Sequence, residues 1–210
     1  MFENNVSFDL LSVHQGHLRV TYRGVPALKC PFDYVLYQML FMSLKPDLVI
    51  EIGTYKGGAA LYYADLLEIV GKGEVHTIDV ESNIPEAVRQ HPRIKVFSGG
   101  WEAYPIENTK AYGTVLVIED SAHTYENTLA ALNKFSSVVT PGSYLIVEDG
   151  IVDCLVALGR YKQEDFNGGP TRAIKEFMES NSDRYRIDRS LCDFFGTNAT
   201  WNPNGYLRRI

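Results

Sequence analysis

Two segments of this sequence end in the same pair of acids, and each pair follows a run of apolar residues. The segments are VLVIED, residues 115–120, and YLIVED, residues 144–149. Each run has the length and composition of a buried strand. If the two strands are neighbours, carboxylates converge at one edge of a sheet, where they cannot all stay ionised unless a cation joins them. Asp120, Glu148 and Asp149 therefore form a candidate metal site.

The ligand types at this candidate site favour a hard divalent ion. Three carboxylates with no cysteine and one nearby histidine suit Mg²⁺ or Mn²⁺ better than Zn²⁺, and Mg²⁺ is the first choice. One objection is geometric, because consecutive strand residues such as Glu148 and Asp149 point to opposite faces. Both reach one ion only if the strand has already ended, and Gly150 would allow such a break. Taken singly, each acid could equally be a helix N-cap or a solvated strand end.

His123 lies three residues after Asp120, in the segment DSAHTY before the next expected helix. Its imidazole can therefore face the same edge of the sheet. The ordinary pKa of histidine, about 6.5, suits a proton acceptor at neutral pH. A lone histidine is more often structural, and the other four histidines of the chain have no comparable setting. His123 is thus the candidate base.

A glycine-rich turn follows an earlier apolar run, in the segment VIEIGTYKGG, residues 49–58. The run carries Glu51 and then Gly53, Gly57 and Gly58 at the start of an expected helix. Glycines at such a turn let the backbone approach a ligand closely. The spacing is not GxGxxG, which weakens a dinucleotide-binding interpretation. A turn that serves only the fold is the alternative.

Two further residues follow strands at the same edge. Asp79 ends the run EVHTID, where a carboxylate can accept hydrogen bonds from both hydroxyls of a ribose, although many strands end in aspartate. Trp101 follows the third strand in FSGGW. It could stack on an adenine ring, and a core tryptophan is an equal alternative.

These residues stand at the ends of five apolar runs that alternate with helix-length segments. The runs span residues 47–53, 74–80, 93–97, 114–120 and 144–150, and the expected helices span 57–70, 84–90, 124–138 and 170–181. Continuous runs rich in Val and Ile, joined by crossover helices, predict an α/β fold with an open, doubly wound, mostly parallel sheet. The late segments YRIDRS and PNGYLRRI could supply closing antiparallel strands.

The length predicts a single domain over residues 1–210. Residues 1–45 would be an N-terminal packing segment, in which 32–44 have a helical spacing of large side chains. The connection over residues 151–169 is too long for a plain strand-to-helix loop, and we expect it to be a lid.

Composition excludes several classes of partner. A net charge of −6 argues against nucleic acid, and the sequence has neither a membrane-length apolar run nor a signal peptide, so a cytoplasmic protein is expected. Cys30, Cys154 and Cys192 have no CxxC spacing and are expected to be reduced. Aromatic residues in the N-terminal segment and in residues 194–201 predict exposed apolar surface, and hence a homo-oligomer.

With these motifs in hand, the chain resembles the cephalosporin hydroxylase and rhamnosyl O-methyltransferase family, relatives of the metal-dependent macrolide sugar O-methyltransferases. The matching stretches are residues 46–58, 76–81, 120–125, 147–149, 169–177 and 202–208. The resemblance implies a Rossmann-like class I methyltransferase fold, S-adenosylmethionine as methyl donor, and oligomers in several members. It also implies that Mg²⁺ is held by Asp120, Glu148 and Asp149.

The resemblance also implies roles for single residues. The ExGxxxG spacing is similar to motif I of class I methyltransferases, which would set Glu51 near the amino group of the donor and Tyr55 at the pocket wall. In the sugar methyltransferases, the histidine three places after the metal-binding aspartate is the proposed base, which corresponds to His123. Catechol-type enzymes have a lysine there. Ala59 departs from relatives that often have a serine to bind the methionine carboxylate.

The sequence therefore predicts an S-adenosylmethionine- and Mg²⁺-dependent O-methyltransferase for a hydroxyl of a small molecule, with a sugar or glycosylated natural product as acceptor. Two alternatives stay open. One is a metal-dependent hydrolase or hydroxylase on the same fold, although no two-histidine, one-carboxylate set for iron is evident. The other is a non-catalytic partner subunit, for which Ala59 is the hint.

Overall fold

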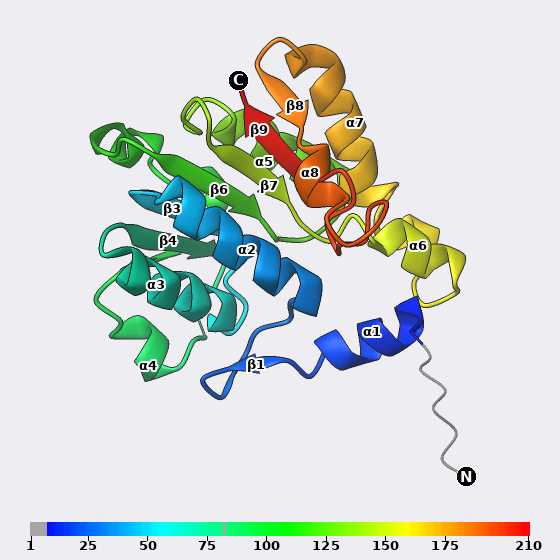
Figure 1. Ribbon diagram of the computed structural model, residues 1–210, viewed down its shortest axis with the longest axis horizontal. Helices are drawn as coiled ribbons and strands as arrows, with labels where there is room; N and C mark the ends of the chain where they lie inside the picture. Colours follow the sequence, from blue (N-terminus) through cyan, green and yellow to red (C-terminus); the bar gives the residue numbers. More distant parts are fainter. Residues whose placement is uncertain (1–7, 82) are drawn as a thin grey trace.

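A seven-stranded sheet forms the centre of the computed structural model, which describes residues 8–81 and 83–210 (Figure 1). The strand order is β5-β4-β3-β6-β7-β9-β8. The strands are β3 (Leu48–Ile52), β4 (Glu74–Asp79), β5 (Ile94–Ser98), β6 (Val115–Glu119), β7 (Tyr144–Val147), β8 (Tyr185–Ile187) and β9 (Tyr206–Arg209). A separate two-stranded ribbon joins β1 (Thr21–Tyr22) to β2 (Val25–Pro26).

The direction of the strands identifies the fold. β3 to β7 pair in parallel, whereas β9 is antiparallel to both β7 and β8. The prediction of a Rossmann-like class I methyltransferase fold with an antiparallel closing strand is confirmed. Only the second of the two late segments is antiparallel, because β9 inserts between β7 and β8 and leaves β8 parallel to the others. The order reverses between β3 and β6, and ligands of open α/β sheets bind at such a switch point, beyond the carboxyl ends of the strands.

Helices cover both faces of the sheet, as the continuous apolar strands require (Figure 1). The helices are α1 (Leu10–His17), α2 (Pro31–Leu44), α3 (Gly58–Val70), α4 (Glu86–Arg89), α5 (Tyr125–Phe135), α6 (Val152–Ala157), α7 (Gly169–Asn181) and α8 (Arg189–Cys192). Short 3-10 turns lie at η1 (Trp101–Ala103), η2 (Ile106–Ala111) and η3 (Gln163–Asp165). The predicted helices all form, within three residues at each end.

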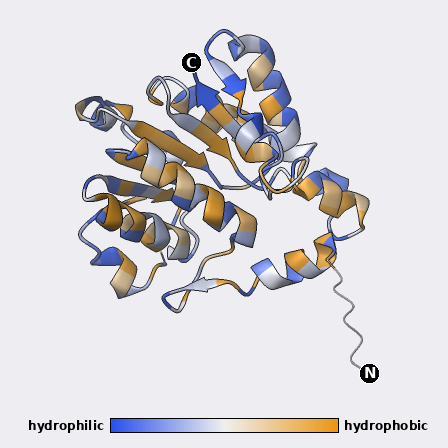
Figure 2. Cartoon of the chain, viewed as in Figure 1, coloured by the Kyte–Doolittle hydropathy of each residue, from blue (hydrophilic) through white to orange (hydrophobic). Residues whose placement is uncertain are grey.

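Two hydrophobic cores hold these layers together. One packs α2 and α3 against residues such as Val49 and Ile118, and the other packs α5 and α7 against their strand neighbours Ile50 and Val117. Every residue of β3, β6 and β7 is buried, and Figure 2 shows these strands as hydrophobic. Each fully buried Val, Ile or Leu side chain contributes about 1.5–3 kcal/mol relative to exposure. Burial of β3, β6 and β7 therefore fixes the position of their carboxyl ends, where a ligand of such a sheet would bind.

The N-terminal segment packs in two places. Pro31 begins α2, where its missing N–H has no helical partner to lose, and Lys45 ends it in a left-handed conformation with φ 49°. α1 shares a small apolar cluster with α6 and Trp201. Residues 1–7 of the predicted packing segment lie outside the described residues. In the ranges that the structure describes, no helix combines the length and the apolar character needed to cross a membrane.

Candidate active site

A cavity of about 600 Å³ opens at the carboxyl ends of the strands. Eight of the residues predicted from the sequence line it: Gly53, Tyr55, Gly58, Asp79, Trp101, Asp120, His123 and Asp149. Three others, Glu51, Gly57 and Glu148, are buried but are not part of its lining. The cavity thus brings the glycine-rich turn and the acid cluster, which consists of Asp120, Glu148 and Asp149, together at one end of the sheet.

The glycine-rich turn is fixed by close backbone contacts. Gly53 has φ +102°, and a Cβ there would lie 1.9 Å from the carbonyl oxygen of Asp120. A Cβ on Gly58 would lie 2.2 Å from the carbonyl oxygen of Pro26. Both positions therefore require glycine, and the turn presents its backbone to the cavity.

Asp79 stabilises the backbone of this turn. Its Oδ2 accepts hydrogen bonds from the backbone N–H groups of Thr54, at 3.0 Å, and Tyr55, at 2.9 Å. Its Oδ1 accepts a third from Val80, at 2.8 Å. Asp79 lines the cavity, so it combines a structural contact with an open position for a ligand hydroxyl. Its ribose-binding role stays a prediction.

Glu51 is fully buried beneath the turn. One of its carboxylate oxygens accepts a hydrogen bond from the Thr77 hydroxyl, whereas Oε1 has no hydrogen-bond partner among the residues that the structure describes. Burial raises the pKa of Glu51 to about 8, and the hydrogen bond from Thr77 offsets only part of this effect. The structure does not bring Glu51 to the cavity surface, and its predicted contact with the amino group of the donor stays untested.

Trp101 is held by residues that follow β6. Its indole Nε1 donates to Asn127 Oδ1 at 3.1 Å, and Asn127 Nδ2 donates to Ser121 Oγ at 2.6 Å. The ring is partly buried, packs on the core beside α5 and lines the cavity. It is therefore available to a planar ligand on one side only.

The acid cluster forms because β6 and β7 are adjacent and parallel. Glu119 pairs with Val147, so that Asp120 lies beside Glu148 rather than beside Asp149. β7 ends at Val147, and Asp149 adopts a left-handed backbone with φ 57°. The expected break before Asp149 is confirmed, and it turns the Asp149 carboxylate toward the cavity.

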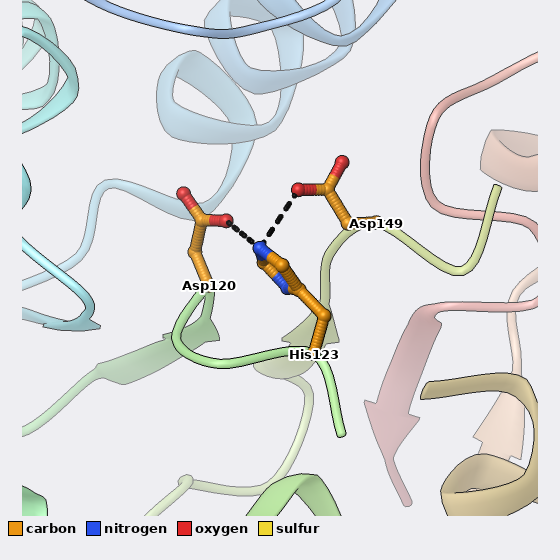
Figure 3. A group of neighbouring side chains, drawn as sticks. All are labelled: Asp120, His123 and Asp149. Atoms are coloured by element: carbon orange, nitrogen blue, oxygen red, sulfur yellow. Dashed lines mark ion pairs between the residues drawn. The ribbon is translucent and has the colours of Figure 1, made fainter. Parts of the chain in front are cut away.

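His123 lies between Asp120 and Asp149 (Figure 3). Its Nε2 is 3.1 Å from Asp149 Oδ2 and 3.9 Å from Asp120 Oδ1. Burial alone would lower the pKa of His123, but the charges of Asp149 and Asp120 outweigh it and raise that pKa. The ligand atoms of the three residues lie within 4.8 Å of one another, which is the spacing of a candidate cation site.

Lys29 joins the cluster, although it was not predicted from the sequence. Its Nζ forms ion pairs with Asp120 Oδ2 and with Glu148 Oε2, the latter at 2.5 Å, and its side chain is 3% exposed. Burial lowers the pKa of Lys29, but the charges of Asp120 and Glu148 outweigh it, so the ammonium is charged. The available signal was a lone lysine in an otherwise uncharged stretch, VPALKCPF.

Glu148 faces Lys29 and two tyrosines. Its Oε1 accepts hydrogen bonds from Tyr37 at 2.5 Å and Tyr63 at 3.4 Å. Burial raises the pKa of Glu148 to about 7, the nearby Asp120 adds to this rise, and Lys29 opposes it. Its role as a metal ligand stays a prediction.

A second wall of the cavity comes from α1, whose histidines were not predicted to line a site, together with the C-terminal loop. His14 and His17, one helical turn apart, both line the cavity with Tyr161 and Trp201. The His17 and Trp201 rings lie 5.1 Å apart, and the Tyr161 hydroxyl lies 3.4 Å from His14 Nε2. Trp201 is 5% exposed, so it does not contribute to exposed aromatic surface as the sequence suggested.

Comparison with known proteins identifies the family. The family model described as Rhamnosyl O-methyltransferase/CmcI matches residues 15–210. The chain belongs to this family. Rhamnosyl O-methyltransferase from Mycobacterium tuberculosis is 30% identical over 199 residues, which cover 91% of this chain and 78% of that protein. The Mycobacterium leprae protein of the same name is 29% identical over 196 residues, covering 90% and 82%.

Solved structures share the fold of this rhamnosyl O-methyltransferase/CmcI family member. A structure of CmcI with Mg and SAM has a TM-score of 0.65 and 22% identity, and covers 92% of this chain and 77% of that one. The methyltransferase MycE of the mycinamycin biosynthetic pathway, in complex with Mg, SAH and mycinamycin VI, has a TM-score of 0.54 and 19% identity, covering 73% and 45%. Family membership confirms the expected enzyme class, an S-adenosylmethionine-dependent O-methyltransferase.

Proposed function

We propose that this enzyme methylates a hydroxyl group of a sugar and uses a divalent cation, Mg²⁺ or Mn²⁺, in doing so. The observation that supports this best is the single cavity that contains both the glycine-rich turn and the Asp120–His123–Asp149 cluster. The names of the mycobacterial relatives favour a rhamnosyl acceptor. The Mg-containing structures of CmcI and MycE favour a metal.

The donor would occupy the half of the cavity under the glycine-rich turn. Gly53, Gly58 and Tyr55 would surround its methionine part, Asp79 would accept hydrogen bonds from the ribose hydroxyls, and Trp101 would stack on adenine. When bound, S-adenosylmethionine supplies an electrophilic methyl group. Glu51 and Gly57, which are buried behind the cavity lining, would support the residues that line this half.

The acid cluster fits a hard divalent ion. Asp120 and Asp149 offer carboxylate oxygens that line the cavity, and their distance from each other suits one ion. When bound, the ion would lower the pKa of the acceptor hydroxyl. Glu148, the third ligand predicted from the sequence, is engaged by Lys29 and Tyr37.

His123 would remove the proton of the acceptor hydroxyl at Nε2. Nε2 lies beside Asp120 and Asp149 at the cavity, and Asp149 would stabilise the imidazolium that forms. As His123 takes the proton, the acceptor oxygen would bond to the methyl carbon while the carbon–sulfur bond of the donor breaks, leaving S-adenosylhomocysteine as the neutral thioether. Because His123 is the base, it would not serve as a ligand while the acceptor is bound.

The acceptor would lie against the wall formed by His14, His17, Tyr161 and Trp201. Aromatic faces pack on the C–H surface of a sugar ring, while imidazole and phenol groups exchange hydrogen bonds with its hydroxyls. The connection over residues 151–169, which carries α6 and Tyr161, would act as a lid that excludes water.

Calorimetric titration tests this proposal. S-adenosylmethionine should bind the wild type with or without Mg²⁺, and Asp120→Asn should keep donor binding while losing Mg²⁺ binding. Methyl transfer to a rhamnoside should then stop on chelation and return with Mg²⁺. Full activity with chelator present would refute the metal, and transfer to other hydroxyl acceptors alone would refute the sugar.

We also propose a homo-oligomer. Phe8, Phe194 and Phe195 are 71%, 48% and 44% exposed, and the Phe195 ring lies 5.1 Å from Phe32. Apolar surface of this kind is expected at a subunit contact. Light scattering would test it, since a monomer at all concentrations would contradict the proposal.

A further inference from the structure

Helix α1 brings two histidines to a wall of the cavity near the acid cluster. His14 and His17 lie one helical turn apart, both are buried, and both line the cavity together with Trp201. The charge of Asp149 acts on both rings, which places them close to that carboxylate. An acceptor that presents one hydroxyl to His123 would therefore contact this wall with its other atoms.

The tautomer of His17 is fixed by the backbone of α1. Its Nδ1 lies 2.7 Å from the carbonyl oxygen of His14. That carbonyl belongs to the last turn of the helix and has only a long contact, 3.4 Å, with the N–H of Leu18. A carbonyl oxygen can only accept a hydrogen bond, so Nδ1 carries the proton. In the neutral ring, Nε2 then has a lone pair and no proton.

Burial keeps the His17 ring neutral. The residue is 6% exposed, and burial lowers the pKa of its imidazole below the ordinary value of 6.5. The hydrogen bond to the His14 carbonyl and the charge of Asp149 oppose this effect only in part, and the charge of Lys29 adds to it. At neutral pH, His17 is therefore a donor at Nδ1 and an acceptor at Nε2.

The acceptor atom of His17 is open to a ligand. Across residues 8–81 and 83–210 no hydrogen bond to His17 Nε2 forms, and the residue lines the cavity. His14 differs, because its Nε2 lies 3.4 Å from the Tyr161 hydroxyl and its Nδ1 is buried. A ligand hydroxyl that reaches this wall would thus donate to His17.

The surroundings of His17 are closely packed. The Trp201 ring lies 5.1 Å from the His17 ring and 6.4 Å from the His14 ring, on which it stacks. The Trp201 backbone is held on both sides, since its N–H donates to Asp33 at 2.9 Å and its carbonyl accepts from the Ile151 N–H at 3.1 Å. A preorganised group of this kind loses little entropy when a ligand binds.

We propose that His17 selects acceptors with a second, free hydroxyl on the sugar ring that is methylated. That hydroxyl donates to Nε2, while Trp201 packs on the C–H surface beside it. A deoxy or O-methyl group at the same position leaves Nε2 without its hydrogen bond, so such an acceptor is disfavoured. The inference rests on the proposed sugar acceptor and adds the hydroxyl pattern that the site requires.

Methyl transfer to phenyl α-L-rhamnoside and to its monodeoxy analogues tests the inference in the full-length enzyme. For one analogue that keeps the methylated hydroxyl, the wild-type kcat/KM should fall about 10-fold or more, because Nε2 loses its donor. His17→Phe should lower kcat/KM for the rhamnoside itself about 10-fold, and that analogue should then react within about 3-fold of it. His17→Gln keeps an acceptor oxygen and should retain part of the discrimination.

Two kinetic results would overturn the inference. One is wild type that accepts every such analogue as well as the rhamnoside. The other is His17→Phe that still rejects the same analogue, because another group would then recognise the hydroxyl. His91→Phe is the matched control and should discriminate like the wild type, since His91 does not line the cavity. Wild type that methylates another class of acceptor but no rhamnoside would instead refute the proposed sugar acceptor.

A measurement on the wild type covers the case in which the His17 variants do not fold. Nitrogen-15 NMR of the histidine-labelled protein should show His17 protonated at Nδ1 and unprotonated at Nε2 at neutral pH. Addition of the rhamnoside to the complex with S-adenosylhomocysteine should shift the Nε2 resonance. A proton on Nε2, or an Nε2 resonance that the bound rhamnoside leaves unchanged, would overturn the inference.

Discussion

The ends of β6 and β7 carry the same dipeptide but place it differently. At the end of β6, Glu119 is buried on the α5 side, where its carboxylate accepts from the Ser121 hydroxyl, and Asp120 faces the cavity. At the end of β7, Glu148 is the residue beside Asp120, and Asp149 leaves the strand altogether. The same dipeptide thus contributes only Asp120 to the acid cluster at the end of β6, where Glu119 is buried elsewhere. At the end of β7 it contributes both Glu148 and Asp149.

The difference arises from a register offset of one residue. Paired residues of parallel neighbours point to the same face, and Glu119 pairs with Val147, so the two Glu-Asp pairs are out of step. Glu119 of the β6 pair is supported by residues that follow it in sequence, Ser121 and Asn127, whereas Asp120 pairs with the distant Lys29. The β7 pair is supported by distant segments, through Lys29, Tyr37 and Asn202. A one-residue shift therefore determines which acids can share an ion.

The largest expected effect concerns His123, the residue that contacts both strand ends. His123→Ala should slow methyl transfer by about 10²-fold or more, because it removes the imidazole beside Asp149 that would take the acceptor proton. Single-turnover transfer measures this, and S-adenosylmethionine affinity should change little. His91→Ala is the matched control, since His91 pairs with Asp65 and does not line the cavity. An unchanged single-turnover rate in His123→Ala would remove it as the base.

Asp33 lies on α2 and bonds to Trp201 and to Tyr206 of β9, the strand beside β7. This buried carboxyl group should make the unfolding free energy depend on pH. Asp33 is buried and accepts hydrogen bonds from Trp201 N–H and the Tyr206 hydroxyl, both at 2.9 Å, and burial raises its pKa from 3.8 to about 6. The folded carboxyl thus binds its proton more tightly than the unfolded one. Its contribution to stability is present below the unfolded pKa and is lost as the pH rises toward about 6, a change of about 3 kcal/mol.

Urea unfolding of wild type and Asp33→Asn across this range measures the effect. The variant lacks the titrating group, so the difference in unfolding free energy should shift by about 2 kcal/mol in favour of the variant between pH 4 and pH 7, most of the full change. Taking the difference cancels the titration of other buried acids such as Glu51. A difference that stays flat with pH would show that Asp33 is not the responsible group.

A smaller effect should distinguish the two tyrosines that contact Glu148. Tyr37→Phe removes the hydroxyl that donates to Oε1 at 2.5 Å, and it should reduce the unfolding free energy by about 2 kcal/mol. Tyr63→Phe, whose hydroxyl is 3.4 Å away, should cost about 1 kcal/mol or less. Thermal or urea unfolding measures both. Equal losses would mean that Glu148 is not held specifically by Tyr37.

The smallest expected effect lies in the connection that follows the β7 end. Tyr161→Phe removes a hydroxyl from the proposed acceptor wall, and it should raise the KM for the acceptor by about 3- to 10-fold with little change in kcat. Tyr125→Phe is the control, because Tyr125 bonds to Glu176 and is not part of the cavity lining. A change in donor affinity instead would assign Tyr161 to the donor half.

Local sequence patterns were sufficient for the fold. Runs of Val, Ile and Leu that end in acids or glycines specify buried strands, and the intervening periodic segments specify crossover helices. The order of strands and helices along the chain could therefore be predicted. β8 was harder to orient, because three paired residues carry no directional signal of their own. Its direction depends on β9 inserting beside β7.

The candidate site was only partly predictable. Asp120, His123 and Asp149 were identified because they follow apolar runs that predict strands, on the condition that the two strands are neighbours, as they are in the structure. Lys29 was missed because its contacts are 91 and 119 residues away along the chain. His14 and His17 were missed for the same reason, since α1 reaches the cavity only through packing with α6 and Trp201.

The sequence by itself determined that the chain has a class I methyltransferase fold and that two strands end in paired acids. Those properties depend on residue type and short spacing, which hydrophobic burial converts into structure. Only the tertiary structure decided how the two acid pairs align. Register, the burial of Lys29 and the position of α1 depend on contacts between distant segments, so the question of which acids remain available to a metal ion is settled in three dimensions.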